Sequence, residues 1–224
     1  MLEAPAEAAR YALTRRLLPV LRHHMVVHLQ PIGMIYEVLE RKLAMVNPDL
    51  GAVREGLAKI NFLARSSVAS CLDVVTWLAP DANTSIGVGD GVAECVSTVS
   101  GDFRFRGFTV TNECGDAPLR VSQAALREVF TAALIAITDS AEEPVDLLLQ
   151  IRLAGSQAVI SVHTRQGKAT GFTSDIGYRA LGWSDVEALA QAHQVHLQKD
   201  GAQAVFTFAA SPASAVSGVT NAVA

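Results

Sequence analysis

Three histidines lie within six positions of one another near the start of the chain. His23, His24 and His28 belong to the stretch "LRHHMVVHLQPIGMIYEVLERKL", residues 21 to 43. Histidine is expensive to bury, and an exposed imidazole is a nucleophile that titrates near neutral pH and a common metal ligand. The residue types and their spacing therefore allow either nucleophilic chemistry or metal binding.

Metal binding is the weaker of these two possibilities. His24 and His28 are four residues apart and could form a helical pair of ligands. No third ligand lies nearby in the sequence, and the glutamate of a zinc-protease helix motif is absent. The three cysteines, Cys71, Cys95 and Cys114, have no metal-ligand spacing, so we predict no metal site.

The histidines stand on a predicted amphipathic helix from about Pro5 to Val46, whose apolar pattern sets their directions. With about 100° per residue and His23 at zero, the core stripe falls between roughly 160° and 240°. It consists of Leu18, Leu21, Met25, Leu29, Ile32, Tyr36, Leu39 and Leu43. His23 therefore points away from the core, whereas His24 and His28 lie at the edge of the stripe, where a ring commonly packs against its neighbours.

An apolar patch surrounds His23 on the face turned away from the core stripe. Within about 60° of His23 lie Val20, Val27, Met34 and Val38. Exposed apolar patches often mark docking sites. The alternative is that this face is a dimer seam, which would bury the patch and His23 together.

The charge of the chain is unevenly distributed. The net charge of −4 argues against nucleic-acid binding. Residues 1 to 80 hold nine Lys or Arg against seven Asp or Glu, whereas residues 81 to 224 hold nine against fifteen, which hints at two modules. Close to His23, a basic cluster of Arg15, Arg16 and Arg22 could complement an acidic partner, or could merely keep the helix solvated.

A second predicted helix runs from about Leu50 to Leu78, with apolar residues at spacings of three and four. The sequence "NPD" at 47 to 49 ends the first helix and caps the second. The two helices form an antiparallel hairpin that cannot cover its own apolar stripe. We therefore predict a homodimer in which two hairpins make a four-helix bundle.

The rest of the chain mixes helices with mostly adjacent strands, which predicts an α+β sandwich with helices on one face of a sheet. The helices are expected in "DGVAECVSTVSGDF", "SQAALREVFTAALIAITDSA" and "SDVEALAQAHQ". The strands are expected in "GFTVTNEC", "VDLLLQIRLA", "AVISVHTR" and, as a pair around Asp200 and Gly201, "HLQKDGAQAVFTFAA". The predicted domains are residues 1–80 and 84–210, followed by a disordered tail over 211–224.

Three features predict a cytoplasmic protein without a membrane partner. Apolar stretches such as "AALIAI" are much shorter than the roughly 20 residues needed to span a bilayer. The sequence "MLEAPAEAAR" is acidic where a signal peptide would be basic. An odd number of cysteines suits a reducing compartment.

Several of these stretches resemble bacterial sensor histidine kinases and related phosphotransferases. "HHMVVHLQPI", from His23 to Ile32, resembles the phosphoacceptor helix of their dimerisation and histidine-phosphotransfer domain, and Leu29–Gln30 is similar to the sporulation phosphorelay phosphotransferases. "LREVFTAALIAITDSA" resembles the helix that carries the kinase N box. "ALGWSDVEALAQAHQVHLQKDGAQAVFTFA" resembles the end of the ATP-binding domain. The resemblance covers about residues 10 to 210 and implies a Bergerat-type, histidine-kinase ATPase-like α/β sandwich over 84–210.

The nucleotide motifs of that family are missing. Its magnesium-binding asparagines match Ala132 and Ala136, and its adenine-reading aspartate matches Thr164. Only Gly182 matches the second glycine box. Because hard cations need oxygen ligands and a triphosphate needs its charge neutralised, the resemblance implies a degenerate domain that binds no ATP and no other cofactor.

The phosphoacceptor motif also departs from the family. Sensor kinases place an acidic residue directly after the phosphorylated histidine, where this chain has His24, and often Asn or Thr four residues after it, where this chain has Val27. The second difference predicts weak phosphatase activity. The first leaves open whether His23, His24 or neither is phosphorylated.

The resemblance implies a histidine-containing phosphotransferase that relays phosphoryl groups between receiver-domain aspartates in a bacterial two-component phosphorelay. It would not be an autophosphorylating, ATP-dependent kinase, and magnesium would belong to the receiver partner. His23 would be the phosphoacceptor, and His24 an orienting residue or an alternative acceptor. The expected receiver-binding surface consists of Arg16, Val20, Arg22, Val27, Met34 and Val38. The alternative function is a non-catalytic pseudokinase adaptor that binds a receiver or a histidine kinase. The direction of phosphate flow stays open.

Overall fold

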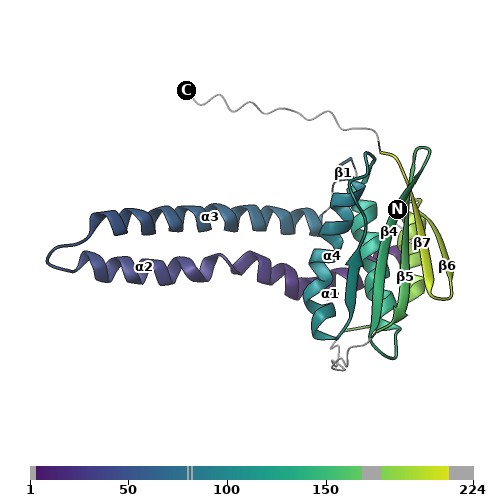
Figure 1. The fold of residues 1–224 in the computed structure, drawn as a ribbon, viewed down its shortest axis with the longest axis horizontal. Helices are drawn as coiled ribbons and strands as arrows, with labels where there is room; N and C mark the ends of the chain where they lie inside the picture. The colour runs from purple at the N-terminus through teal and green to yellow at the C-terminus, as the bar shows by residue number, and fades with distance from the viewer. Residues whose placement is uncertain (1–3, 80, 82, 168–177, 212–224) are drawn as a thin grey trace. The chain divides into compact units, whose positions relative to one another are not determined.

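The computed structural model describes residues 4–79, 81, 83–167 and 178–211 (Figure 1). The chain divides into two compact units, one of residues 16–80 and one of residues 1–15 together with 81–224. We call them the helical unit and the sheet unit. Helix α1 (Ala4–Val26) begins in the sheet unit and ends in the helical unit.

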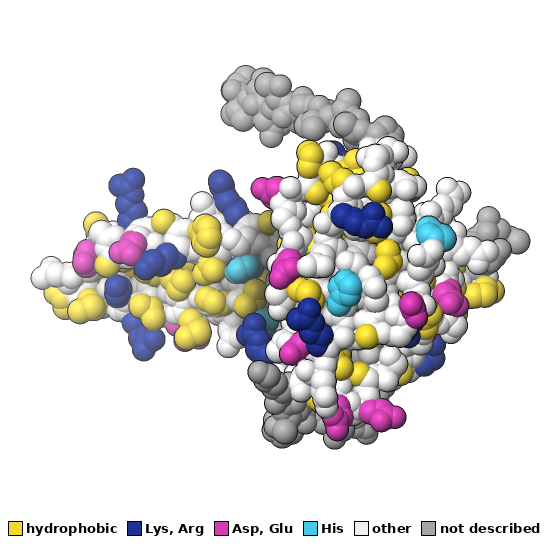
Figure 2. All heavy atoms as spheres, turned by 45° about the vertical axis from the view of Figure 1, so that its right-hand side comes forward, with side chains coloured by type: hydrophobic (Ala, Val, Ile, Leu, Met, Phe, Trp, Pro, Cys, Tyr) yellow, Lys and Arg dark blue, Asp and Glu magenta, His cyan; other side chains and the backbone are white. Residues whose placement is uncertain are grey.

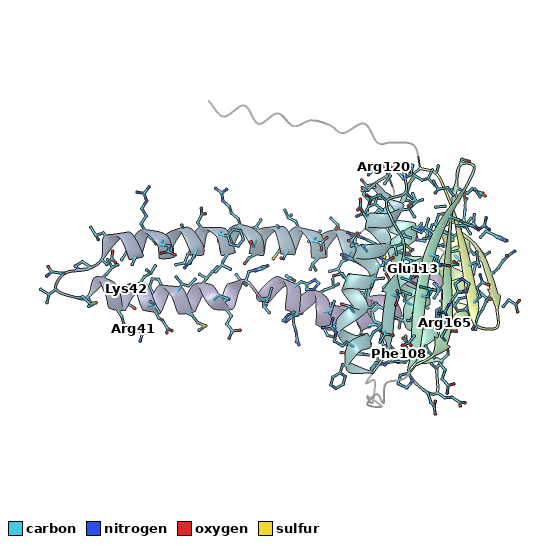
Figure 3. The ribbon with its side chains drawn as sticks, viewed as in Figure 1. Arg41, Lys42, Phe108, Glu113, Arg120 and Arg165 are labelled. Atoms are coloured by element: carbon cyan, nitrogen blue, oxygen red, sulfur yellow. The ribbon has the colours of Figure 1, made fainter. Side chains whose placement is uncertain are left out.

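The helical unit contains an antiparallel hairpin of α2 (Leu29–Leu43) and α3 (Leu50–Leu78). The bounds of α3 are those that the sequence predicts. The Asp49 side chain caps α3 by accepting a hydrogen bond from the backbone N–H of Ala52 at 3.1 Å. Arg41 and Lys42 lie in the last turn of α2 (Figure 3), where positive charge stabilises the negative end of the helix dipole.

The prediction of one continuous helix from Pro5 to Val46 is wrong. The α-helix is interrupted by a turn at Val27 and His28, between α1 and α2. Pro31 provides the reason, because proline has no N–H to donate to the carbonyl of Val27, four residues earlier, and its ring would clash with that carbonyl. The angular count from His23 therefore does not extend into α2.

The structure also corrects the predicted core stripe. Leu21 and Leu39 are buried as predicted, but several members of the stripe are exposed. These exposed members are Leu18, Leu29, Tyr36 and Leu43.

The sheet unit is an α+β fold, as predicted. Its five-stranded mixed sheet has the order β2 (Thr109–Asn112), β4 (Val145–Ala154), β5 (Gln157–Gln166), β7 (Gln203–Ala209) and β6 (His196–Asp200). Strand β2 is parallel to β4, and the other neighbours are antiparallel. Helices α4 (Val88–Phe105), α6 (Thr131–Asp139) and α7 (Trp183–Ala192) lie on one face (Figure 1). Two strands of three residues each, β1 (Ser85–Gly87) and β3 (Arg120–Ser122), pair separately and were not predicted.

The core of the sheet unit lies between this sheet and its helices. Alternate side chains of the three central strands point inward, and each is at most 3% exposed. They are Leu147, Leu149, Ala158, Ile160, Val162, Ala204, Phe206 and Phe208. Phe206 meets Phe130 edge to face, with ring centroids 5.8 Å apart. Each large apolar side chain buried here contributes about 1.5–3 kcal/mol.

The first half of α1 belongs to the sheet unit, so the predicted boundary of a helical domain over 1–80 differs from the structure. The apolar residues at helical spacing, Ala6, Ala9, Ala12 and Leu13, are buried. Arg10 pairs with Glu128, which lies 118 positions further along the chain. The predicted tail over 211–224 lies outside the described residues except for Ser211, whose N–H donates to the carbonyl of Arg120 at 2.8 Å.

The long buried helix predicted around "ALREVFTAALIAITD" contains a π-helical turn. It consists of α5 (Gln123–Ala125), the π turn η1 (Leu126–Phe130) and α6. Two neighbouring charged residues of the turn, Arg127 and Glu128, are both buried. Each finds its own ion partner, Arg127 with Glu94 and Glu128 with Arg10.

None of the helices in the described part of the chain has the length and hydropathy needed to cross a bilayer. The three cysteines are free thiols. Cys95 is fully buried, and this burial raises the pKa of its thiol to about 12, which fits the core role expected for a small apolar residue.

Candidate functional site

His23 lies near the end of α1 and is exposed, as the periodicity predicts. Its backbone carbonyl accepts the final hydrogen bond of the helix, from the N–H of Val27 at 3.0 Å. Among the described residues, no side chain or backbone group forms a hydrogen bond or ion pair with its ring. The imidazole is therefore accessible to a reactant from solvent.

His24 and His28 are half-buried, as their predicted place at the edge of the stripe requires. The His24 ring lies 6.3 Å from the His23 ring between centroids, with the planes tilted by 54°. His28 occupies the N-cap position of α2 without a capping hydrogen bond from its side chain. Within residues 4–79, 81, 83–167 and 178–211, no group of three or more His, Cys, Asp or Glu side chains could hold a metal ion.

The predicted receiver-binding residues fall on two helices and the break between them. Arg16, Val20 and Arg22 share α1 with His23, and Met34 and Val38 belong to α2. Val27 and Met34 are 41% and 63% exposed, so they present apolar side chains to solvent on this surface. Figure 2 shows hydrophobic side chains gathered among a few cationic ones over the surface of these helices. Leu29 and Tyr36 are also exposed, although the pattern of one continuous helix placed them in the core stripe.

The positions that match the magnesium-binding asparagines of sensor histidine kinases are buried and carry alanine. Ala132 and Ala136 are buried in α6, at 0% and 2% exposure, and present methyl groups. Thr164, on β5, donates its hydroxyl to the carbonyl of Ala202 at 3.0 Å. It lines a cavity of about 190 Å³ that has Lys199 but no acidic side chain among its lining residues. The methyl groups of Ala132 and Ala136 offer no oxygen atom that could ligate a magnesium ion.

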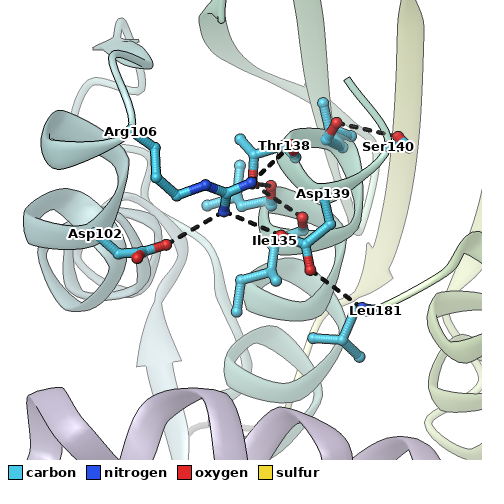
Figure 4. Close-up of polar contacts among 9 residues, drawn as sticks. Asp102, Arg106, Ile135, Thr138, Asp139, Ser140 and Leu181 are labelled. Carbon is cyan, nitrogen blue, oxygen red and sulfur yellow. Dashed lines mark hydrogen bonds and ion pairs between the residues drawn. The ribbon is translucent and has the colours of Figure 1, made fainter. Parts of the chain in front are cut away.

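A buried carboxylate that sequence analysis missed lies at the end of α6 (Figure 4). Asp139 accepts a hydrogen bond from Arg106 Nη1 at 3.0 Å and from the backbone N–H of Leu181 at 3.1 Å. Arg106 also donates to the carbonyl of Thr138 at 2.9 Å and pairs with Asp102 at 3.3 Å. Asp139 thus ties the residue before Gly182 to α6.

A second buried carboxylate, Glu128, joins three elements of the sheet unit. Arg10 donates to both of its oxygens, at 2.8 and 2.7 Å, and His193 Nε2 lies 2.7 Å from Oε2. Burial alone would raise the pKa of Glu128, but the hydrogen bonds with His193 and Arg10 outweigh burial and hold the pKa below its ordinary value. His193 is consequently part of the scaffold.

No protein-family model matches the chain, and no curated protein matches its sequence. Among solved structures, a histidine kinase of Acinetobacter baumannii is similar at 13% identity, over 84% of this chain and 97% of that chain, with a TM-score of 0.41. A bacterial phosphotransferase is similar at 16% identity, over 93% and 98%, with a TM-score of 0.38. A histidine kinase from Burkholderia phymatum is similar at 11% identity, over 90% and 97%, with a TM-score of 0.41. At these identities, the function must be argued from the residues of this chain.

Proposed function

We propose that this protein is a histidine phosphotransferase of a two-component phosphorelay, with His23 as the phosphoacceptor. The observation that carries the proposal is the exposed, unpaired imidazole of His23 at the end of α1. The buried methyls of Ala132 and Ala136 support a function without ATP. The phosphoryl group would therefore come from another protein.

The transfer asks little of this chain beyond an accessible nucleophile. A neutral ring nitrogen of His23 attacks the phosphorus of an aspartyl phosphate in line. A nitrogen–phosphorus bond forms, the bond from phosphorus to the aspartate oxygen breaks, and the carboxylate leaves with its electron pair. The acidic pocket and magnesium of the receiver neutralise the phosphoryl charge. Return of the group to a second receiver reverses these steps.

The surface around His23 would position the receiver. Val27 and Met34 offer apolar contact, and Arg16 and Arg22 offer charge opposite to that of an acidic pocket. Rim charges of this kind act mainly on the association rate. His24, whose ring centroid is 6.3 Å from that of His23, could orient the nucleophile or accept the phosphoryl group itself.

A homodimer would cover the apolar surface of the hairpin. Large apolar side chains are exposed along both helices of the hairpin. They include Met34, Tyr36, Val38 and Leu43 on α2, and Leu57, Phe62, Val68, Leu72 and Val75 on α3. A monomer rarely leaves so many in one unit. Pairing of two hairpins into a four-helix bundle would bury them.

The test is incubation of the full chain with a panel of ³²P-labelled receiver domains from the same organism. Acid-labile, base-stable label identifies phosphohistidine. We expect label on wild type and on His28→Gln, and none on His23→Gln. Label that vanishes with His24→Gln and survives His23→Gln would move the acceptor to His24.

A non-catalytic adaptor is the second candidate, favoured by the exposed apolar surface and by the absence of an acidic residue directly after His23. An adaptor would bind a receiver or a histidine kinase and would tolerate His23→Gln. It would lose binding when charge is introduced by Val27→Asp or Met34→Asp. Binding of a receiver without any transfer of label would establish this function in place of phosphotransfer.

A further inference from the structure

A cavity of about 600 Å³ lies within the sheet unit, between the first half of α1 and the start of α7. No step of the proposed phosphotransfer uses it. Its volume falls in the range of small-molecule sites, about 300–1,000 Å³. The residues that give it chemical character are Tyr11, Arg15, Tyr178, Arg179 and Asp185.

The two arginines of the cavity differ in how their charges are balanced. Arg179 makes a bidentate ion pair with Asp185, with both nitrogen–oxygen distances at 2.9 Å. Asp185 also accepts a hydrogen bond from the backbone N–H of Gly182 at 2.9 Å. The carboxylate is therefore fully engaged, and the charge of Arg179 is compensated.

Arg15 has no such partner, because no carboxylate among the described residues pairs with it. Its guanidinium carbon lies 5.2 Å from the ring centroid of Tyr178 and 5.9 Å from that of Tyr11. Its Nη1 donates to the hydroxyl of Tyr11 at 3.3 Å. The two rings thus hold a cation at the wall of the cavity while leaving its charge unbalanced.

These features match the recognition of an organic anion. A guanidinium presents a planar fork of N–H donors that fits a carboxylate or a phosphate. Tyr11 and Tyr178 are 64% and 41% exposed, so each has surface left for a flat group to pack against.

We propose that this cavity binds a small flat organic anion, with its carboxylate or phosphate paired to Arg15 and its ring packed against Tyr11 and Tyr178. The site is independent of phosphotransfer at His23. A bound ligand would contact α1 and the residues before α7 at once, and would stabilise the folded sheet unit by mass action.

The proposal can be tested with four probes: phenyl phosphate, benzoate, inorganic phosphate and the neutral benzamide. Each is titrated into the full chain by ¹H–¹⁵N NMR, and melting temperatures are measured in parallel. We expect phenyl phosphate or benzoate to bind saturably, with a Kd on the order of 1 mM as befits about ten non-hydrogen atoms. The preferred anion of the two distinguishes a phosphate site from a carboxylate site.

Arg15→Gln should weaken binding about tenfold or more. The affinity of Arg15→Lys should lie between those of wild type and Arg15→Gln, because lysine keeps the charge and loses the planar set of N–H donors. Arg54→Gln, which removes an exposed arginine from α3, is the matched control and should bind as wild type does. Circular dichroism checks the fold of each variant, and Arg15→Lys carries the test if Arg15→Gln is unfolded. Absence of binding by both aromatic anions, equal binding of benzamide and benzoate, equal binding of inorganic and phenyl phosphate, or unchanged affinity in both Arg15 variants would overturn the proposal.

Discussion

The large apolar side chains of the sheet unit are mostly buried, whereas the helical unit leaves many of its own exposed to solvent. Phe206 is fully buried in the sheet unit, and Phe62 on α3 is 69% exposed. The ion pairs differ in the same way, because Glu128 is buried with Arg10 while Glu55 and Lys59 pair on the surface of α3. The sheet unit therefore has a closed core, whereas the helical unit has an exposed apolar surface.

The largest expected effect concerns the two phenylalanines. Phe206→Ala should lower the free energy of unfolding of the sheet unit by about 3–5 kcal/mol, because it leaves a cavity beneath Phe130 and Trp183. Denaturant unfolding in a Trp77→Phe background, in which Trp183 is the reporting fluorophore, measures this loss.

The matched substitution Phe62→Ala should leave that transition unchanged and should instead shift the proposed homodimer toward monomer in analytical ultracentrifugation. A wild-type protein that sediments as a monomer at micromolar concentration would contradict the proposed homodimer. An unfolding curve for Phe206→Ala that matches that of wild type would contradict the closely packed core of the sheet unit.

Removal of the buried carboxylate should have the next largest effect. Glu128→Gln leaves Arg10 and His193 without their anion and should destabilise the sheet unit by about 3 kcal/mol. Glu55→Gln, which opens the exposed pair with Lys59, should cause no measurable change. Equal effects of the two substitutions in the same unfolding assay would remove the distinction between internal and surface charge.

The same carboxylate makes the stability of the sheet unit depend on pH. Because the folded pKa of Glu128 lies below the ordinary 4.5, its contribution is complete above 4.5 and is lost as pH falls through the lower folded value. Burial alone would raise the pKa of Asp185, but the hydrogen bonds from Arg179 and Gly182 outweigh burial and lower it. Asp185 therefore changes the stability with pH in the same direction as Glu128. The free energy of unfolding, measured between pH 3 and 6, should therefore fall on acidification, with a shallower slope in Glu128→Gln. An identical slope in the variant would show that Glu128 does not titrate as argued.

The smallest expected effects are in the helical hairpin, at two glycines with opposite surroundings. A Cβ at Gly56 would lie 2.5 Å from Leu39 Cδ2, so Gly56→Ala should separate α2 from α3 and destabilise the hairpin by about 1–2 kcal/mol. A Cβ at Gly33 would meet nothing within 4 Å, so Gly33→Ala should stabilise α2 by about 0.5–1 kcal/mol. Thermal melts followed at 222 nm check both signs, and stabilisation by both substitutions would show that the helices are not packed as described.

Elements that depend on residues close together in the sequence could be predicted from it. The spacing of apolar residues predicted α3, α4 and α7 and the antiparallel strands β4 and β5, and the turn at Asp200–Gly201 predicted the pair β6 and β7. The exposure of His23 followed from the same count, because it needed only the residues of one helix. The break before Pro31 was equally local and was missed, although the rule that proline obstructs the carbonyl four residues earlier would have found it.

The sequence by itself determined the fold class and the accessible histidine, since periodicity decides which face of an element is buried. Tertiary structure alone decided that the first half of α1 belongs with the sheet, that a π turn buries both Arg127 and Glu128, and that Asp139 meets Leu181. It also created the cavity beside Arg15, whose walls lie more than 160 positions apart in the sequence. The physical reason is that an ion pair or a cavity wall depends on groups brought together by folding, and no local pattern encodes the partner.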